Sequence, residues 1–195
     1  MMTIEPDLAE AIRTALAVRG IEARRELVSL PDYPLVATDL ETVVVKLRAS
    51  HNDAHDEVYW TRILGDGGAA VAPLLVNEVV PILHWFGVAT QYLAPDRDTD
   101  ERDAPAAGRA MRRVHDIAFE YPEPDGSAWM PHDSQPRNFI LHQGLLHLVD
   151  LNNQEQHTHE SARHGAAGDF LSELRMDTRA HAYAQFLDAY DGRGL

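Results

Sequence analysis

The chain has 195 residues, of which 45% are apolar and 25% charged, with no cysteine and a formal net charge of −14. This composition is that of a globular protein able to bury a core. The absence of cysteine excludes disulfides, thiolate catalysis and Cys-based zinc sites. The negative net charge argues against a nucleic-acid-binding surface. The first residues lack the pattern of a signal peptide and no apolar run has the length of a membrane span, so we expect a cytoplasmic protein without a membrane partner.

The first half of the chain predicts helices and short strands. Pro6 opens a helical pattern that Gly20 ends. Three runs rich in β-branched residues follow, ELVSL, LVATDL and TVVVKL, and they predict strands separated by turns such as PDYP. Residues 52–64 then predict a helix, with Asn52 as its N-cap and Gly65 as its stop.

A polar stretch divides the chain. Before it, the runs VAPLLVNEVVPIL and FGVATQYL predict two more strands. Residues 95–105 hold two prolines and many charges, which predicts a boundary. We therefore expect an N-terminal lobe over residues 1–94, with a small antiparallel sheet and one helix, and a short C-terminal lobe over residues 95–195.

The second half predicts helices around one hairpin. An apolar stripe from Ala107 to Ala118 has helical spacing. Residues 139–141 and 145–149 predict the hairpin. A polar stretch reaches Gly168, and helices are expected over residues 169–190. The fold class is therefore α+β.

Three oxygen-bearing side chains surround this hairpin. With the turn centred on Gly144, Asn138 and Asp150 are six residues to either side and are expected to face each other at its open end. An amide oxygen and a carboxylate are hard ligands that suit Mg²⁺, which also binds substrate phosphates. Asp133 lies on the preceding loop, close enough in the chain to reach the same space.

This segment resembles the catalytic segment of the protein-kinase-like fold. Asp133, four intervening residues, Asn138, and a hairpin that ends in Asp150 are most similar to the motif of aminoglycoside phosphotransferases. The resemblance implies a two-lobed fold whose N-terminal lobe binds ATP. It also implies that Asp133 positions the acceptor hydroxyl and takes its proton, while Asn138 and Asp150 bind Mg²⁺.

The same resemblance assigns roles in the first half of the chain. Lys46, the only lysine, stands where the family has the lysine that holds the α- and β-phosphates, although a strand-end lysine on its own is typically exposed. Glu57 lies on a largely apolar helix face, where an unpaired charge is costly, so we expect it to pair with Lys46. Gln91, Tyr92 and Leu93 stand where backbone groups would bind the adenine.

The resemblance has a supporting residue and two departures. Asp169 stands where the family has an aspartate that braces the catalytic loop. The family's histidine two residues before the catalytic aspartate is Pro131 here, and the neighbouring His132 either takes over its role in supporting the loop or only caps it. The PDYP turn, in the place of the phosphate-covering loop, has no glycine to let backbone N–H groups approach the phosphates.

Other kinds of site are less well supported. The eleven histidines include the pairs His51/His55 and His157/His159, but they form no H-E-x-x-H motif, so structural or surface roles are favoured over zinc binding. The glycines at 65–68 follow a helix and not a strand, which argues against a Walker-type loop. No serine has the G-x-S-x-G context of a hydrolase.

We therefore expect an enzyme that uses ATP and Mg²⁺ to phosphorylate a hydroxyl of a small molecule. The acidic balance is compatible with a cationic acceptor such as an amino sugar. Two alternatives stay open at this point, a minimal protein serine/threonine kinase and a non-catalytic binding or regulatory module. The sequence predicts neither the acceptor nor the oligomeric state, and it does not separate ATP from GTP.

Overall fold

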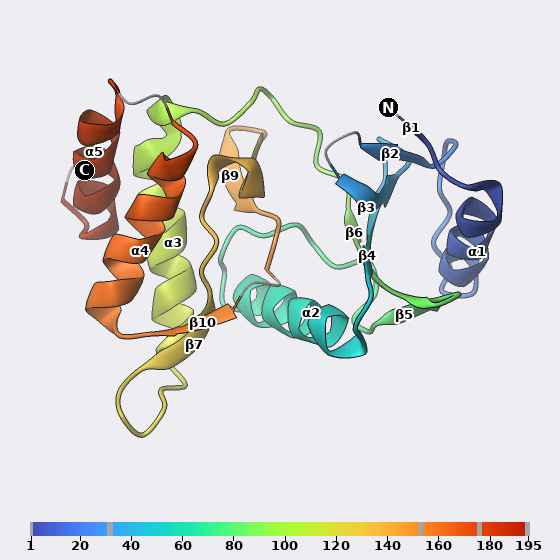
Figure 1. Cartoon of the computed structure of the whole chain (residues 1–195), viewed down its shortest axis with the longest axis horizontal. Coiled ribbons are helices and arrows are strands. Elements are labelled where there is room, and N and C mark those ends of the chain that lie inside the picture. Colours follow the sequence, from blue (N-terminus) through green and yellow to red (C-terminus); the bar gives the residue numbers. More distant parts are fainter. Residues whose placement is uncertain (1, 31–32, 152–153, 175–176, 194–195) are drawn as a thin grey trace. The chain divides into compact units, whose positions relative to one another are not determined.

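The computed structural model describes residues 2–30, 33–151, 154–174 and 177–193, which form two compact units (Figure 1). The first unit comprises Met1–Arg62 and Ala72–Ala94, and the second comprises Ile63–Val71 and Pro95–Leu195. Within the described residues, no helix has both the length and the apolar character needed to cross a membrane.

The first unit is built on an antiparallel sheet. Among the described residues the sheet has six strands in the order β1-β2-β3-β4-β6-β5. Their bounds are β1 Met2–Thr3, β2 Val28–Leu30, β3 Tyr33–Thr38, β4 Val43–Arg48, β5 Val80–Ile82 and β6 Trp85–Gln91. Pro31 and Asp32, the first half of the turn expected to cover phosphates, lie outside the described residues.

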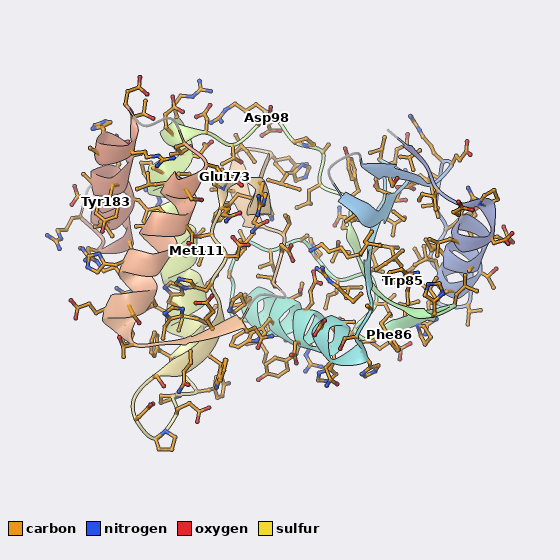
Figure 2. All side chains as sticks on the ribbon, in the orientation of Figure 1. Trp85, Phe86, Asp98, Met111, Glu173 and Tyr183 are labelled. Atoms are coloured by element: carbon orange, nitrogen blue, oxygen red, sulfur yellow. The ribbon has the colours of Figure 1, made fainter. Side chains whose placement is uncertain are left out.

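Two helices cover this sheet, and they correspond to the two helical patterns of the sequence, although the expected lobe was given one helix. Helix α1, Pro6–Ala17, and helix α2, His51–Asp66, pack on opposite faces because successive strand residues point to opposite sides. Neighbouring residues of β6 show this alternation, since Trp85 joins the cluster of α1 and Phe86 joins the cluster of α2 (Figure 2). The buried residues of α1 are Ala9, Ile12 and Leu16.

Two local expectations in this unit are wrong. Helix α2 begins at His51, so Asn52 is inside it, and the Ser50 hydroxyl accepts the N–H of Asp53 at 3.4 Å. Serine caps a helix about as well as asparagine does, so the helix can start one residue earlier. Of the run over residues 71–83, only β5 is a strand, while the segment around Pro73 bonds to β6 through Leu75 N–H and the Pro73 carbonyl oxygen without forming a continuous strand.

The turn between β3 and β4 is organised by one buried carboxylate. Asp39 accepts the N–H groups of Glu41, Thr42 and Val43 at 2.8–3.0 Å, and the Thr42 hydroxyl as well. Burial alone raises the pKa of Asp39, but the Thr42 hydroxyl and these three N–H groups outweigh it and hold the pKa well below its usual range. The carboxylate therefore fixes the start of β4, the strand that carries Lys46.

The second unit is mainly helical. Its helices are η1 Glu101–Asp103, α3 Ala104–Ala118, η2 Pro136–Asn138, α4 His159–Ser172 and α5 Arg179–Tyr190. Its strands are β7 Ala128–Pro131, β8 Phe139–His142, β9 Leu145–Leu148 and β10 Gln154–His157, paired as β7 with β10 and β8 with β9. The stripe predicted for α3 is buried at Ala107, Met111, Val114, Ile117 and Ala118.

The polar stretch expected up to Gly168 is instead strand β10 followed by helix α4. Thr158 caps α4 by accepting the N–H of Ser161 in a reciprocal capping box. The buried side of the helix consists largely of alanines, Ala162, Ala166 and Ala167, which give only a weak apolar stripe in the sequence. Asp169 consequently lies within the last turns of α4 and does not begin a helix.

The hairpin β8–β9 differs by one residue from the predicted register. Gln143 and Gly144 both have positive φ, 53° and 75°, as a two-residue turn requires. The turn is therefore centred between these two residues and not on Gly144. The N–H of Val149 bonds to the carbonyl oxygen of Asn138 at 2.9 Å, so Asn138 faces Val149, and Asp150 is one residue beyond the expected position.

Candidate functional site

A first group of candidate residues lies on β4 and α2. Lys46 Nζ is 2.5 Å from Glu57 Oε1, and the two side chains are only 11% and 2% exposed. Arg48 contributes a second cation, since its Nε and Nη2 donate to Glu57 Oε2 at 2.9 and 2.7 Å. A single buried carboxylate therefore orients two basic side chains.

The alternation of β4 explains this arrangement. Val43, Val45 and Leu47 are buried, so Lys46 and Arg48 share the other face of the strand. Lys46 pairs in register with Val88, which belongs to the cluster that contacts α2. The strand thus presents both cations to the helix that carries Glu57. Arg48 was not among the predicted site residues, although its i+2 spacing from Lys46 was a usable signal.

The segment expected to bind the adenine follows β6. Gln91 ends that strand, and its N–H bonds to the carbonyl oxygen of Pro73 at 2.8 Å. The N–H of Tyr92 bonds to the carbonyl oxygen of Thr42 at 3.0 Å, and Leu93 is buried. Two N–H groups of the segment are thus engaged within the unit, and base recognition would have to use its other backbone groups.

A second group of candidate residues lies on the loop between β7 and β8 in the second unit. Asp133 is half-buried, and its Oδ1 accepts the N–H of Gln135 at 3.3 Å. The side-chain nitrogen of the buried Asn138 donates to the carbonyl oxygen of Asp133 at 3.1 Å. An amide binds a cation through its oxygen. The hydrogen bond of the nitrogen fixes the orientation of the amide group and leaves the oxygen of Asn138 for a cation.

Helix α4 anchors this loop. The hydroxyl of Ser134, which is fully buried, donates to the carbonyl oxygen of Ala166 at 2.6 Å. The ring of His132 packs where α4 has no side chain, since a β-carbon at Gly165 would lie 2.3 Å from its Nε2. Ser134 was not predicted, because a serine in a loop gives no sequence signal of the carbonyl group that it will bind.

Asp169 lies beside the loop, on α4. Its Oδ2 is 3.8 Å from Nε2 of His132. Burial, and then the nearby carboxylate of Asp133, raise the pKa of Asp169 to about 6. Burial, and then the neighbouring ring of His157, lower the pKa of His132 to about 4, so its imidazole is neutral at pH 7. Whether this pair replaces the contact that Pro131 cannot make stays a prediction.

The side chains at the end of the hairpin have the oxygen atoms that a hard divalent cation binds. Asp150 and Asp133 are half-buried carboxylates and Asn138 adds an amide oxygen, which are the ligand types that Mg²⁺ binds. Asn138 and Asp150 are near neighbours at the open end of the hairpin, although they are not directly opposite each other. The metal-binding role predicted for them stays a prediction.

Comparisons with known proteins give matches in structure alone. No protein-family model matches the chain, and no curated protein matches its sequence. A choline/ethanolamine kinase family protein from Mesorhizobium loti is 16% identical with a TM-score of 0.62, over 95% of this chain and 77% of that chain.

Two further solved structures are similar to the chain. An amicoumacin kinase in complex with AMP-PNP, Ca²⁺ and a ligand named Ami is 14% identical with a TM-score of 0.63, over 100% of this chain and 75% of that chain. An aminoglycoside-3′-phosphotransferase of type VIII is 13% identical with a TM-score of 0.54, over 95% of this chain and 100% of that chain. At these identities the likeness concerns the fold, and it confirms the fold predicted from residues 133–150. The chain has a protein-kinase-like fold.

Proposed function

We propose that this protein transfers the γ-phosphoryl group of ATP to a hydroxyl group of a small molecule. The observation that carries the proposal is the buried ion pair of Lys46 and Glu57, on a strand and a helix of the sheet unit. Burying two charges has a large desolvation cost, so a buried ion pair suggests a functional role. In kinase-like folds such a pair orients the lysine toward the phosphates.

Each residue of the candidate site has a defined task in this reaction. Lys46 would donate to the α- and β-phosphates in the orientation that Glu57 imposes. Asn138 and Asp150 would hold Mg²⁺, which supplies positive charge for the β- and γ-phosphates. Asp133 would accept a hydrogen bond from the acceptor hydroxyl and take its proton as the phosphoryl group is transferred.

A cationic alcohol is the acceptor that we favour. Two of the three similar proteins are named after choline or aminoglycosides, and these molecules carry positive charge. The net charge of −14 would attract such molecules over long range. Within the described residues the second unit also carries the acidic side chains Asp133, Asp150 and Asp169 around the loop.

A phosphoryl-transfer assay tests the proposal. The purified protein is incubated with Mg·ATP and a panel of choline, ethanolamine and aminoglycosides, and phosphorylated acceptor is detected by mass spectrometry alongside ADP release. We expect at least one acceptor to be phosphorylated. We expect Asp133→Asn and Asp150→Asn each to lower kcat by about 100-fold or more, because general-base and metal-ligand roles are usually of this size.

Asp98→Asn is the matched control, since Asp98 is exposed in the same unit and the substitution removes the same charge. The control should keep its activity. Equal activity of the wild type and both loop variants would contradict the mechanism.

One observation favours a second candidate function, a nucleotide-binding module without catalysis. Pro131 ends β7 and has no side-chain group able to donate a hydrogen bond, where the resembling motif has histidine. Such a module would bind Mg·ATP in calorimetry without turning over any acceptor in the panel. Turnover that depends on Asp133 would exclude it.

A further inference from the structure

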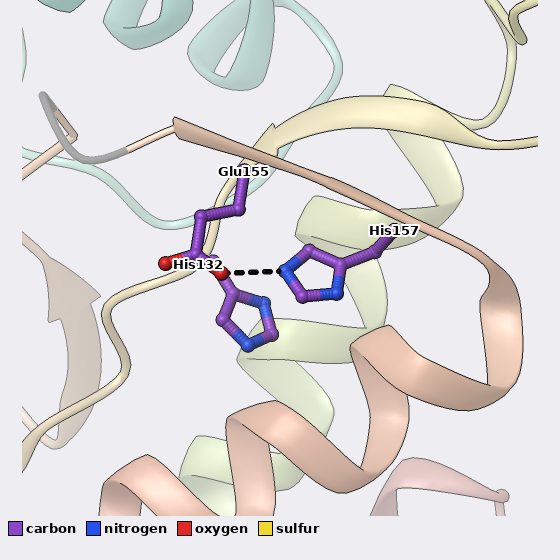
Figure 3. A group of neighbouring side chains, drawn as sticks. All are labelled: His132, Glu155 and His157. Atoms are coloured by element: carbon purple, nitrogen blue, oxygen red, sulfur yellow. Dashed lines mark hydrogen bonds and ion pairs between the residues drawn. The ribbon is translucent and has the colours of Figure 1, made fainter.

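Three side chains with metal-binding atoms meet beside the loop of the second unit. They are His132, which follows β7, and Glu155 and His157 of β10 (Figure 3). Glu155 and His157 are two residues apart, so they point to the same side of the strand. One ligand atom from each of the three residues lies within 4.8 Å of the others, and Nε2 of His157 is 3.1 Å from Oε2 of Glu155.

His132 has a buried nitrogen that nothing in the described part of the chain satisfies. The residue is only 5% exposed, and its Nδ1 has no hydrogen-bond partner among the described residues. The other nitrogen, Nε2, faces α4 at Gly165 and Asp169. The ring stacks on that of His157, with 3.8 Å between centroids and 25° between the ring planes, so the two imidazoles are in contact. An unsatisfied buried nitrogen is costly and calls for a ligand.

We propose that His132, Glu155 and His157 form a binding site for a zinc-like divalent transition-metal cation, separate from the Mg²⁺ site. Two imidazoles and one carboxylate are a known zinc ligand set, with water completing the tetrahedron. In such a site ligand atoms are about 3.3 Å apart, a value that follows from metal–ligand distances of about 2.0–2.1 Å. His157 and Glu155 have nearly this separation already, at 3.1 Å. The ligand atom of His132 lies within 4.8 Å of theirs, so it would move closer, and its stacked ring would rotate until the lone pair in the ring plane points at the ion.

The chemistry of the site selects against Mg²⁺ and Ca²⁺. Those cations take six or more oxygen ligands, whereas this cluster offers two nitrogens and one carboxylate. Asp169 lies behind His132, 3.8 Å from its Nε2, in the place where metal-bound histidines commonly have a carboxylate that orients the ring.

The cation would join two elements that are adjacent to the loop. It would connect β10 to His132, whose next residue is Asp133, and so restrain the start of the loop. This consequence for catalysis rests on the proposed phosphotransferase function, whereas the metal binding itself does not.

Calorimetric titration of the metal-free full chain with Zn²⁺ tests the inference. The titration is done without nucleotide and in excess Mg²⁺, so that zinc does not report on Asn138 and Asp150. We expect saturable binding of one ion per chain. We expect His157→Phe and Glu155→Gln each to weaken it by about tenfold or more, since loss even of a group that supports a ligand costs 10- to 100-fold. Co²⁺ in place of zinc should give visible absorption bands that both variants lose.

His181→Phe and Glu160→Gln are the matched controls, because both residues are exposed in the same unit and the changes are identical in kind. They should bind zinc as the wild type does. His157→Phe removes the metal-binding nitrogens but keeps an aromatic ring packed against His132. A circular dichroism spectrum checks that each variant is folded.

Absence of zinc binding, or wild-type affinity in either cluster variant, would overturn the inference. Because no phosphoryl transfer is measured, this failure is distinct from failure of the proposed function. A protein that binds zinc through these residues but phosphorylates nothing would contradict the proposed function alone.

Discussion

Glu57 balances two cations from a position that water barely reaches. Its side chain is 2% exposed, and it bonds Lys46 through one oxygen and Arg48 through the other. Glu57→Gln would remove the buried negative charge that both Lys46 and Arg48 bond, while their two positive charges stay in a largely water-excluded position. Breaking a buried ion pair in this way costs about 3 kcal/mol or more. We therefore expect urea denaturation to show a loss of about 3 kcal/mol in the unfolding free energy.

A second ion pair of the same unit provides the comparison. Glu78 bonds Arg19 at 2.9 Å, but the Glu78 side chain is 64% exposed. Exposed pairs contribute about 0–1 kcal/mol, so Glu78→Gln should change the unfolding free energy by less than about 1 kcal/mol. Equal losses in the two variants would mean that burial does not determine the stability contribution of Glu57.

The elements differ in how far the sequence could predict them. Helix α3 has a clear apolar stripe, and most of the stripe that the spacing indicated is buried, although Ala110 is only partly buried and Gly108 and His115 are buried as well. Strand β10 has the sequence Gln-Glu-Gln-His, and its place is set by pairing with β7, which a local pattern does not contain. The register of β8–β9 depends on the backbone angles of Gln143 and Gly144, and a shift of one residue cannot be read from hydrophobicity alone.

Helices α3 and α5 are in close contact at one glycine. A β-carbon at Gly108 would lie 2.3 Å from the carbonyl oxygen of Phe186 and 3.2 Å from the backbone nitrogen of Tyr190. Backbone atoms cannot rotate away as a side chain can, so Gly108→Ala would push the helices apart. Overpacking costs about 1–3 kcal/mol, more than the helix propensity that alanine adds. We expect thermal unfolding to show a net loss of about 1–2 kcal/mol.

Gly168 of α4 is the matched control for this substitution. It is exposed, and a β-carbon there would have no neighbour within 4 Å. Gly168→Ala should therefore stabilise the protein by up to about 1 kcal/mol, through helix propensity alone. A stabilising Gly108→Ala would show that the two helices can separate at no cost.

At the scale of the whole molecule, the sequence contained the parts of the candidate site but not its surroundings. Lys46 and Glu57 could be paired because one charge on an apolar helix face needs a partner. Arg48 could have been added from its i+2 spacing to Lys46, whereas Ser134 and the cluster of His132, Glu155 and His157 depend on contacts between segments far apart in the chain. A hydrogen bond to a distant carbonyl group, or a cluster formed by a loop residue and two residues of a strand elsewhere in the chain, leaves no periodic signal in a sequence.

The net charge of −14 also acts on the whole molecule, since like charges repel each other most strongly in the compact state. Raising the ionic strength from about 0.01 M to about 0.1 M shortens the Debye length from about 30 Å to about 10 Å and screens this repulsion. We expect urea denaturation to show that the unfolding free energy rises with NaCl over this range. A variant with Glu22, Glu120 and Glu160 replaced by glutamine removes three exposed negative charges and should show a weaker salt dependence. If stability instead fell with salt, attractive pairs such as Arg163–Asp191, at 2.5 Å, would outweigh the repulsion, and the charges as a whole would stabilise the fold.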